Sequence, residues 1–175
     1  SRVALIDGDR QLDYATLDAR MDAVATALAR DGARLTDVVA ICAATSLEYA
    51  VVFLGALRAG VVVAPLPPSA TPETLGRMLD DAEPVLLFVS KGVDVGADRT
   101  PRVMLDEDGS SGVSSDVSIN TRSFSSWLAG IDVDSIARPL VDVVIDPDTP
   151  FNIIYSSGTT GDPKGIVQAH AMRWA

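Results

Sequence analysis

The feature that most constrains the fold is an alternation of short apolar runs with longer segments of helical spacing. Residues 37–44, 61–66 and 85–89 form almost continuously apolar runs of strand length, which are typical of strands covered on both faces. Segments with apolar residues at helical intervals separate these runs. Parallel neighbouring strands need long crossover connections, usually helices, which pack on the faces of the sheet. The alternation therefore predicts an α/β fold, a doubly wound and largely parallel sheet flanked by helices.

Capping residues mark where the helices of this pattern begin and end. Helices are predicted over residues 14–28, 47–59 and 72–83. Each follows a side chain that can accept a hydrogen bond from the first turn, and each precedes a residue that stops a helix. The expected N-terminal caps are Asp13, Ser46 and Thr71, and the expected stops are Gly32, Gly60 and Pro84. A turn at residues 7–9 also predicts a hairpin before the first helix.

Composition argues against several classes of partner. The chain of 175 residues has a formal net charge of −10, which disfavours nucleic acid or an anionic membrane surface as its main partner. Its single cysteine, Cys42, lies in an apolar run, and we expect it to pack in the core. The longest apolar region, residues 47–66, is interrupted by charges and proline, so no integral membrane segment is predicted. No basic and apolar leader opens the chain, and a cytoplasmic protein is expected.

The second half of the chain has weaker patterns. Residues 102–105 predict a short strand, and residues 123–128 predict a short helix that contains Trp127. Residues 106–120 are rich in Ser, Asp and Gly, which predicts a mobile surface loop. Because nothing rigid would hold the carboxylates of that loop together, we predict no metal site there.

One loop differs from everything else in the chain. Residues 155–167 read YSSGTTGDPKGIV, and the apolar residues 151–155 predict a strand that ends where the loop begins. Ligands of open α/β sheets bind at the carboxyl ends of strands. Glycines permit left-handed or closely approaching backbone, and successive N–H groups in such a loop can hold an anion. The loop contains Gly158, Gly161 and Gly165, the hydroxyls of Ser156, Ser157, Thr159 and Thr160, and the cation of Lys164.

The spacing of this loop excludes the two common nucleotide-binding motifs. A Walker A loop reads G-x-x-x-x-G-K-[ST] and continues into a helix, whereas Gly165 follows Lys164 and residues 166–167 predict another strand. A G-x-G-x-x-G turn is also absent from the loop. Composition leaves two alternatives, a phosphate loop between two strands or a flexible glycine-rich hairpin with an exposed lysine.

The order of the residues resembles a known family. SSGTTGDPKG matches, at ten consecutive positions, the fingerprint [ST]-S-G-[ST]-T-G-x-P-K-G of the adenylate-forming (AMP-binding, acyl-CoA synthetase/ligase) superfamily. The segments LDYATLDARMDAVATALARDGA and LEYAVVFLGALRAGVVVAPLPP are also similar to that family. The resemblance covers residues 1–90 and 148–170 and is weak between them.

Members of this superfamily use ATP and Mg²⁺ to activate a carboxylic acid. The resemblance implies that the carboxylate attacks the α-phosphate, pyrophosphate leaves, and a thiol of coenzyme A or of carrier-bound pantetheine then takes the acyl group. It implies that Lys164 is catalytic, since its charge would offset that of the departing pyrophosphate. Thr159 and Thr160 would donate hydroxyl hydrogen bonds, and Gly158 and Gly161 would supply loop mobility. The nucleotide-binding set implied is Ser156, Ser157, Gly158, Thr159, Thr160, Gly161, Lys164 and Gly165.

Two residues beside the loop are assigned structural roles. Tyr155 ends the predicted strand under the loop, and we expect it to pack. His170 is the single histidine of the chain and is predicted on a strand. We expect it to pack or form a hydrogen bond rather than to act as an acid or base.

The resemblance also implies an incomplete domain. In the family pattern, the adenine-binding segment, the acidic residue associated with the metal, the ribose-binding aspartate and the C-terminal lid domain would all follow Ala175. Residues 1–175 are therefore expected to be an incomplete N-terminal AMP-binding domain, with residues 155–165 as its phosphate loop. We expect this chain alone not to complete adenylation.

Competing functions remain. GTTG and the continuation GIVQAH are more similar to CoA ligases, which favours an acyl-CoA ligase for a fatty or aryl acid. The second candidate is an adenylation module that activates an amino or hydroxy acid for a carrier protein. Two further candidates are not enzymes of this family. One is a non-catalytic nucleotide-binding module, and the other is a flavodoxin-like domain without a ligand.

Overall fold

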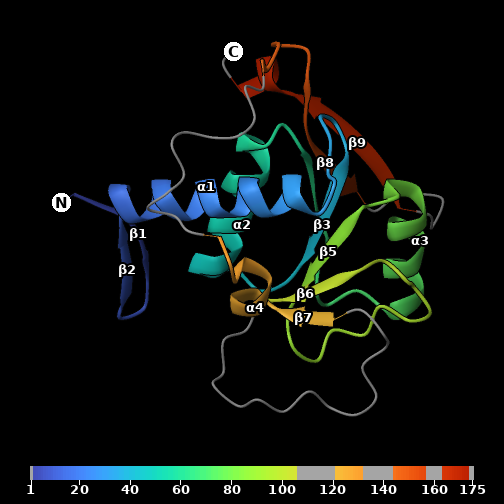
Figure 1. The fold of residues 1–175 in the computed structure, drawn as a ribbon. Helices are drawn as coiled ribbons and strands as arrows, with labels where there is room; N and C mark the ends of the chain where they lie inside the picture. The colour runs from blue at the N-terminus through green and yellow to red at the C-terminus, as the bar shows by residue number, and fades with distance from the viewer. Residues whose placement is uncertain (1, 106–120, 132–143, 157–162, 174–175) are drawn as a thin grey trace.

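The computed structural model describes residues 2–105, 121–131, 144–156 and 163–173. In chain order their elements are β1 (Val3–Asp7), β2 (Arg10–Asp13), α1 (Tyr14–Arg30), β3 (Val38–Cys42), α2 (Leu47–Arg58), β4 (Val62–Pro65), α3 (Pro72–Ala82), β5 (Leu86–Val89), β6 (Arg102–Met104), β7 (Thr121–Ser123), α4 (Phe124–Leu128), β8 (Pro150–Ser156), β9 (Lys164–Ala169) and the 3₁₀ helix η1 (His170–Arg173) (Figure 1).

The described strands form a main sheet and a separate hairpin. The main sheet has seven strands in the order β7-β6-β5-β3-β4-β8-β9. Its neighbours pair in parallel from β7 to β8, and β9 then returns antiparallel to β8. The hairpin consists of β1 and β2, which pair antiparallel around the turn predicted at residues 7–9. The prediction of a largely parallel sheet is confirmed.

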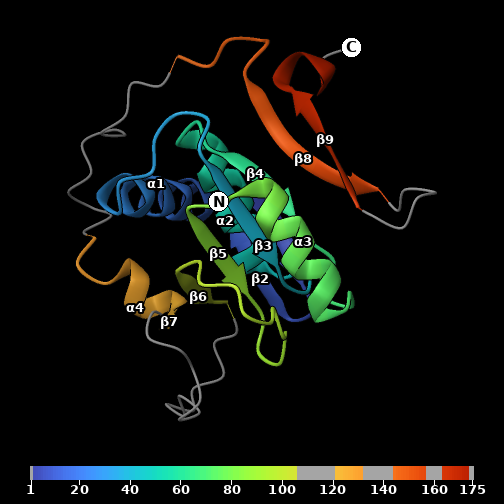
Figure 2. The ribbon, with the colours of Figure 1, turned by 90° about the vertical axis from the view of Figure 1, so that its right-hand side faces the viewer.

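Helices cover both faces of the main sheet (Figure 2). α2 connects β3 to β4, whereas α3 connects β4 to β5 on the other side of β3. Right-handed crossovers that run in opposite directions along a sheet place their helices on opposite faces. Accordingly, α1 and α2 pack on one face and α3 packs on the other. The doubly wound arrangement is confirmed.

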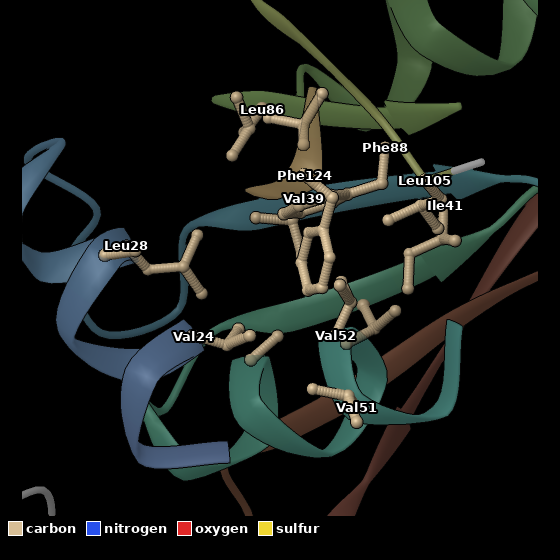
Figure 3. Close-up of a cluster of buried hydrophobic side chains, with 14 of the residues drawn as sticks. Val24, Leu28, Val39, Ile41, Val51, Val52, Leu86, Phe88, Leu105 and Phe124 are labelled. Carbon is tan, nitrogen blue, oxygen red and sulfur yellow. The ribbon is translucent and has the colours of Figure 1, made fainter. Parts of the chain in front are cut away.

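The central strands divide their side chains between two apolar cores because successive residues point to opposite faces. In β3, Val39 and Ile41 meet the buried residues of α1 and α2, as Figure 3 shows. Ala40 and Cys42 of the same strand meet the buried residues of α3. Burial raises the pKa of the Cys42 thiol to about 11. Cys42 is thus a core residue, as predicted.

The helix boundaries follow the predicted caps. The side chains that accept the capping hydrogen bonds are those of Asp13, Ser46 and Thr71. Gly32 and Gly60 have φ angles of 90° and 72°, in the left-handed region that suits a residue after a helix. α3 ends differently, because Glu83 takes the left-handed cap at φ 44° immediately before Pro84.

Tertiary contacts organise the part of the chain with weak patterns. The predicted strand at 102–105 and helix at 123–128 are present as β6 and α4, whereas β7 was not predicted. The indole Nε1 of Trp127 donates to Oδ2 of Asp31 at 2.8 Å, which joins α4 to the end of α1. The loop predicted at 106–120 lies outside the described residues. Among the helices that the structure describes, none has both the length and the apolar character of a membrane span.

Candidate functional site

The predicted loop joins the two strands of the β8–β9 hairpin. The register pairs Ile154 with Ile166 and, at the loop end, Ser156 with Lys164. β8 also pairs in parallel with β4, so Ser156 lies at the edge of the sheet where the parallel strands end. The loop therefore connects strand to strand, as its spacing predicted, and no helix follows Lys164 directly.

The structure describes Ser156, Lys164 and Gly165 of the predicted site. The remaining members, Ser157, Gly158, Thr159, Thr160 and Gly161, lie outside the described residues. Lys164 is the first residue of β9 and Ser156 the last of β8. The two strands are joined by residues 157–163, and the predicted phosphate loop, residues 155–165, also includes the strand ends on either side.

Ser156 and Lys164 are brought together by the strand register. Residues directly opposite in an antiparallel pair project from the same face of the sheet. Both residues are exposed. The end of the hairpin therefore presents one hydroxyl and one cation on a common face, an arrangement that can hold an anionic group.

Tyr155 lies one residue before Ser156 and points to the opposite face, toward α3. Its hydroxyl donates to Oδ2 of Asp81 at 2.7 Å, and the carbonyl oxygen of Met78 lies 3.1 Å away as a second acceptor. Burial and the Asp81 carboxylate both raise the pKa of Tyr155, so its hydroxyl remains protonated. Tyr155 packs as predicted, and it also forms a hydrogen bond that was not predicted.

Gly165 is required by close approach rather than by its backbone angle. A Cβ at this position would lie 2.9 Å from Oδ2 of Asp81 and 3.0 Å from Cγ2 of Ile153. Its φ is not among the positive values, which occur at other glycines of the described chain. Gly165 lets β9 pass directly over the contact between Tyr155 and Asp81.

Asp81 is the residue at this site that sequence reasoning missed. It lies 74 positions before Tyr155 in the chain, as one of two consecutive aspartates near the end of α3. No local pattern distinguishes Asp81 from Asp80, so only the packing of α3 beside β9 could have identified it.

His170 has a structural environment, as predicted, but on a different element. It begins the 3₁₀ helix η1 rather than continuing a strand. Its backbone N–H donates to the carbonyl oxygen of Thr149 at 3.0 Å. Its ring meets that of Phe151 edge-on, with 5.1 Å between centroids. The chain turns at His170 because this contact and hydrogen bond anchor it against the start of β8.

No metal ligand is assigned within the described ranges. These residues contain no group of three or more His, Cys, Asp or Glu side chains placed to hold a metal ion. The described part of the site offers the cation of Lys164 and the hydroxyl of Ser156. Beside them, Gly165 allows β9 to approach Asp81 closely.

Comparisons with known proteins bear on the whole chain. A model of the AMP-binding enzyme family matches residues 1–173. Malpinin synthetase of Mortierella alpina is 34% identical over 168 residues, which is 96% of this chain and 2% of that protein. The probable CoA ligase CCL5 of Humulus lupulus is 28% identical over 176 residues, which is 97% of this chain and 30% of that protein. The chain therefore spans less than a third of the length of these relatives.

Solved structures show the same fold. The anthranilate CoA ligase AuaEII in complex with anthranoyl-AMP has a TM-score of 0.78 at 22% identity, over 97% of this chain and 32% of that one. At this identity the likeness shows the fold alone. The family model matches residues 1–173, and this match shows the family as well as the fold. This chain belongs to the AMP-binding enzyme family.

Proposed function

We propose that this chain forms the phosphate-binding part of an enzyme that activates a carboxylic acid with ATP. The observation that most supports it is the register of the hairpin, which places Lys164 opposite Ser156 at the carboxyl edge of the sheet in a chain of the AMP-binding enzyme family. A carboxylate oxygen would attack the α-phosphorus and form the acyl-adenylate. The bond from that phosphorus to the oxygen bridging to the β-phosphate would break, and pyrophosphate would leave with the electron pair.

The chain's contribution to this step is positioning and charge. Lys164 would lie beside the β- and γ-phosphates and stabilise the negative charge that develops on pyrophosphate. Ser156 would donate a hydrogen bond from the opposite strand. The other proposed members are Ser157, Gly158, Thr159, Thr160, Gly161 and Gly165. Mg²⁺ is proposed because members of the family use it together with ATP. No residue of this chain is proposed as its ligand.

We propose an acid–thiol ligase, in which the acyl group passes from the adenylate to the sulfur of a thiol and AMP leaves. Coenzyme A as the acceptor is supported by the GTTG and GIVQAH segments and by the CoA ligase among the relatives. A second candidate is a carrier protein that bears pantetheine. Its support is the similarity to large synthetases, such as malpinin synthetase and the antimetabolite synthetase AmbB of Pseudomonas aeruginosa.

The proposed activity is that of a larger protein. We propose that residues 1–175 are part of an N-terminal AMP-binding domain and that a C-terminal lid domain belongs to the parent. The coverage of the relatives supports this, because the chain matches 30% of the CoA ligase and far less of the synthetases.

The test is acid-dependent exchange of labelled pyrophosphate into ATP by the full-length parent, measured over a panel of carboxylic acids. We expect exchange with at least one acid and none without acid. The active acid is then supplied with free coenzyme A or with a pantetheine-bearing carrier protein, and the thioester is quantified. Absence of exchange with every acid would contradict the proposal, whereas thioester only on the carrier protein would select the second candidate. The 175-residue chain alone is expected to give no exchange.

A further inference from the structure

We propose that Tyr155 and Asp81 form a clasp that positions the β8–β9 hairpin, and with it Ser156 and Lys164, against helix α3. The consequence for catalysis rests on the proposed function, but the clasp itself is a property of the fold. Tyr155 and Asp81 are positioning residues here, since the Tyr155 side chain leaves the hairpin on the face opposite to Ser156 and Lys164 and contacts Asp81 there.

Among the described residues, the hairpin joins the rest of the sheet through β8, which runs parallel beside β4. The register between β4 and β8 contains the single pair Val63 and Asn152, whereas β3 and β4 share four pairs. β9 is the last strand in the order and pairs with β8. The registered pair lies at Asn152, four residues before Ser156, so contacts outside this ladder help to set the position of the hairpin's loop end.

The clasp supplies such a contact at the loop end. The Tyr155 hydroxyl reaches Oδ2 of Asp81 in the final turn of α3, and Figure 1 shows that end of the hairpin beside α3. The carbonyl oxygen of Met78, one turn earlier in α3, is the second acceptor. The tyrosine thus reaches two successive turns of the helix.

Gly165 makes the clasp possible. Gly165 pairs with Tyr155 across the hairpin, and a Cβ on it would lie 2.9 Å from the same Oδ2 atom and 3.3 Å from Cε1 of Tyr155. Any side chain here would compete with the hydroxyl for the space around the carboxylate. The absence of a side chain at Gly165 lets both strands approach α3 together.

The clasp and the charged pair are adjacent rungs of one ladder. Tyr155 pairs with Gly165, and the next pair toward the loop is Ser156 with Lys164. Consecutive residues in a strand are about 3.3 Å apart, so a shift of the first pair moves the second with it. Holding Tyr155 against α3 therefore sets the position of the Lys164 backbone, from which the side chain with its cation extends.

The test uses the full-length parent and the substitutions Tyr155→Phe and Asp81→Ala. The control is Asp80→Asn, which changes the neighbouring carboxylate of α3, where it lines an open pocket with Val95 and Gly96. Hydrogen exchange of the backbone amides in residues 151–156 and 164–169 reports the hairpin directly. Losing one hydrogen bond should accelerate this exchange roughly twofold to tenfold in both variants and not in the control.

Kinetics separate positioning from general destabilisation. In pyrophosphate exchange, the KM for ATP should rise by a similar roughly twofold to tenfold factor while the KM for the acid stays unchanged. The double variant Tyr155→Phe with Asp81→Ala should be no worse than the more impaired single variant, since both substitutions remove the same contact. Asp81→Asn, which keeps an acceptor oxygen, should recover most of the effect.

Two results would overturn the clasp. One is unchanged amide hydrogen exchange of the hairpin in Tyr155→Phe. This measurement does not depend on enzymatic activity, so it can be made even if the parent shows no acid-dependent pyrophosphate exchange. The other is an equal rise in the KM values for ATP and for the acid, which indicates a general loss of structure. Failure of the wild-type parent to exchange pyrophosphate would instead contradict the proposed function alone.

Discussion

Gly55 of α2 lies so close to Val24 of α1 that a Cβ on Gly55 would be 2.6 Å from the Cβ of Val24. The same added atom would lie 3.0 Å from the backbone oxygen of Met21. Arg58, one turn later in α2, closes the crossing with ion pairs to Asp18 and Asp22 of α1 at 2.6 and 2.7 Å. The two helices thus are in close contact at Gly55 and are joined by ion pairs one turn later. These contacts set how α1 and α2 pack together on one face of the main sheet.

Gly55→Ala is expected to destabilise the fold. Alanine favours a helix over glycine by about 1 kcal/mol, but overpacking at a crossing costs about 1–3 kcal/mol, and the clash involves a Cβ and a backbone oxygen that cannot turn away. The thermal unfolding midpoint should fall. Gly76→Ala in α3 is the matched control, since its added Cβ meets nothing within 4 Å, and it should leave the midpoint equal or higher. Equal midpoints for Gly55→Ala and Gly76→Ala would contradict the close crossing.

Lys164→Ala in the full-length parent should slow adenylation by about 10²-fold, because the proposed function assigns to its charge the stabilisation of departing pyrophosphate. Transfer of the acyl group from supplied acyl-adenylate to the thiol should be largely preserved, since pyrophosphate has already left. Both half-reactions are measured separately by rapid quench. Unchanged adenylation kinetics would remove Lys164 from the mechanism.

Gly165→Ala in the full-length parent should displace the hairpin from α3, because its Cβ would lie 2.9 Å from Oδ2 of Asp81 and 3.0 Å from Cγ2 of Ile153, closer than ordinary van der Waals contact. We expect a lower rate of pyrophosphate exchange, by roughly tenfold, together with an overpacking cost of about 1–3 kcal/mol in stability. Circular dichroism and pyrophosphate exchange measure the two effects. Wild-type values in both would show that β9 tolerates a side chain at this position, contrary to the geometry.

Asp31 should contribute an acid-sensitive part of the stability. Burial alone would raise its pKa, but hydrogen bonds from Arg30, Trp127 and Arg122 outweigh burial, and the pKa of Asp31 is lowered below 3.8. A carboxylate with a lowered folded-state pKa stabilises the fold above the unfolded-state pKa, and this stabilisation is lost as the pH falls through the folded-state value.

Asp31→Asn should therefore lower the stability at pH 7 by about 1–2 kcal/mol and weaken its dependence on pH below about 4. The thermal midpoint measured from pH 7 to pH 3 checks both effects, with Asp80→Asn as the control. A midpoint that falls as steeply with acid in Asp31→Asn as in the wild type would assign the acid sensitivity to other groups.

The elements from α1 to β5 could be predicted because their signals are local. Caps at Asp13, Ser46 and Thr71 stand beside the helices they begin, and each buried strand is a contiguous apolar run. Where the signal was not local, prediction failed. β7 has the sequence TRS and becomes a strand only by pairing with β6. His170 leaves the strand because of contacts with residues about twenty positions earlier.

The partner of a buried charged side chain is a second kind of information that local pattern does not contain. Glu48 appears in the sequence as one acidic residue in the first turn of an apolar helix. The structure buries it to 3% exposure and pairs it with Arg10 of the β1–β2 hairpin, 38 positions away. The helix could be predicted from its own residues, but the partner of its buried charge could not.

The candidate site shows the same division. The sequence by itself determined the family, the alternating α/β order and the position of the loop between two strands, because each depends on consecutive residues such as SSGTTGDPKG. The tertiary structure alone decided that Lys164 faces Ser156, that Gly165 passes over Asp81, and that Tyr155 is held by α3. The physical reason is distance along the chain. Caps and periodicity act within a turn or a strand, whereas the position of this hairpin depends on packing between residues more than seventy positions apart.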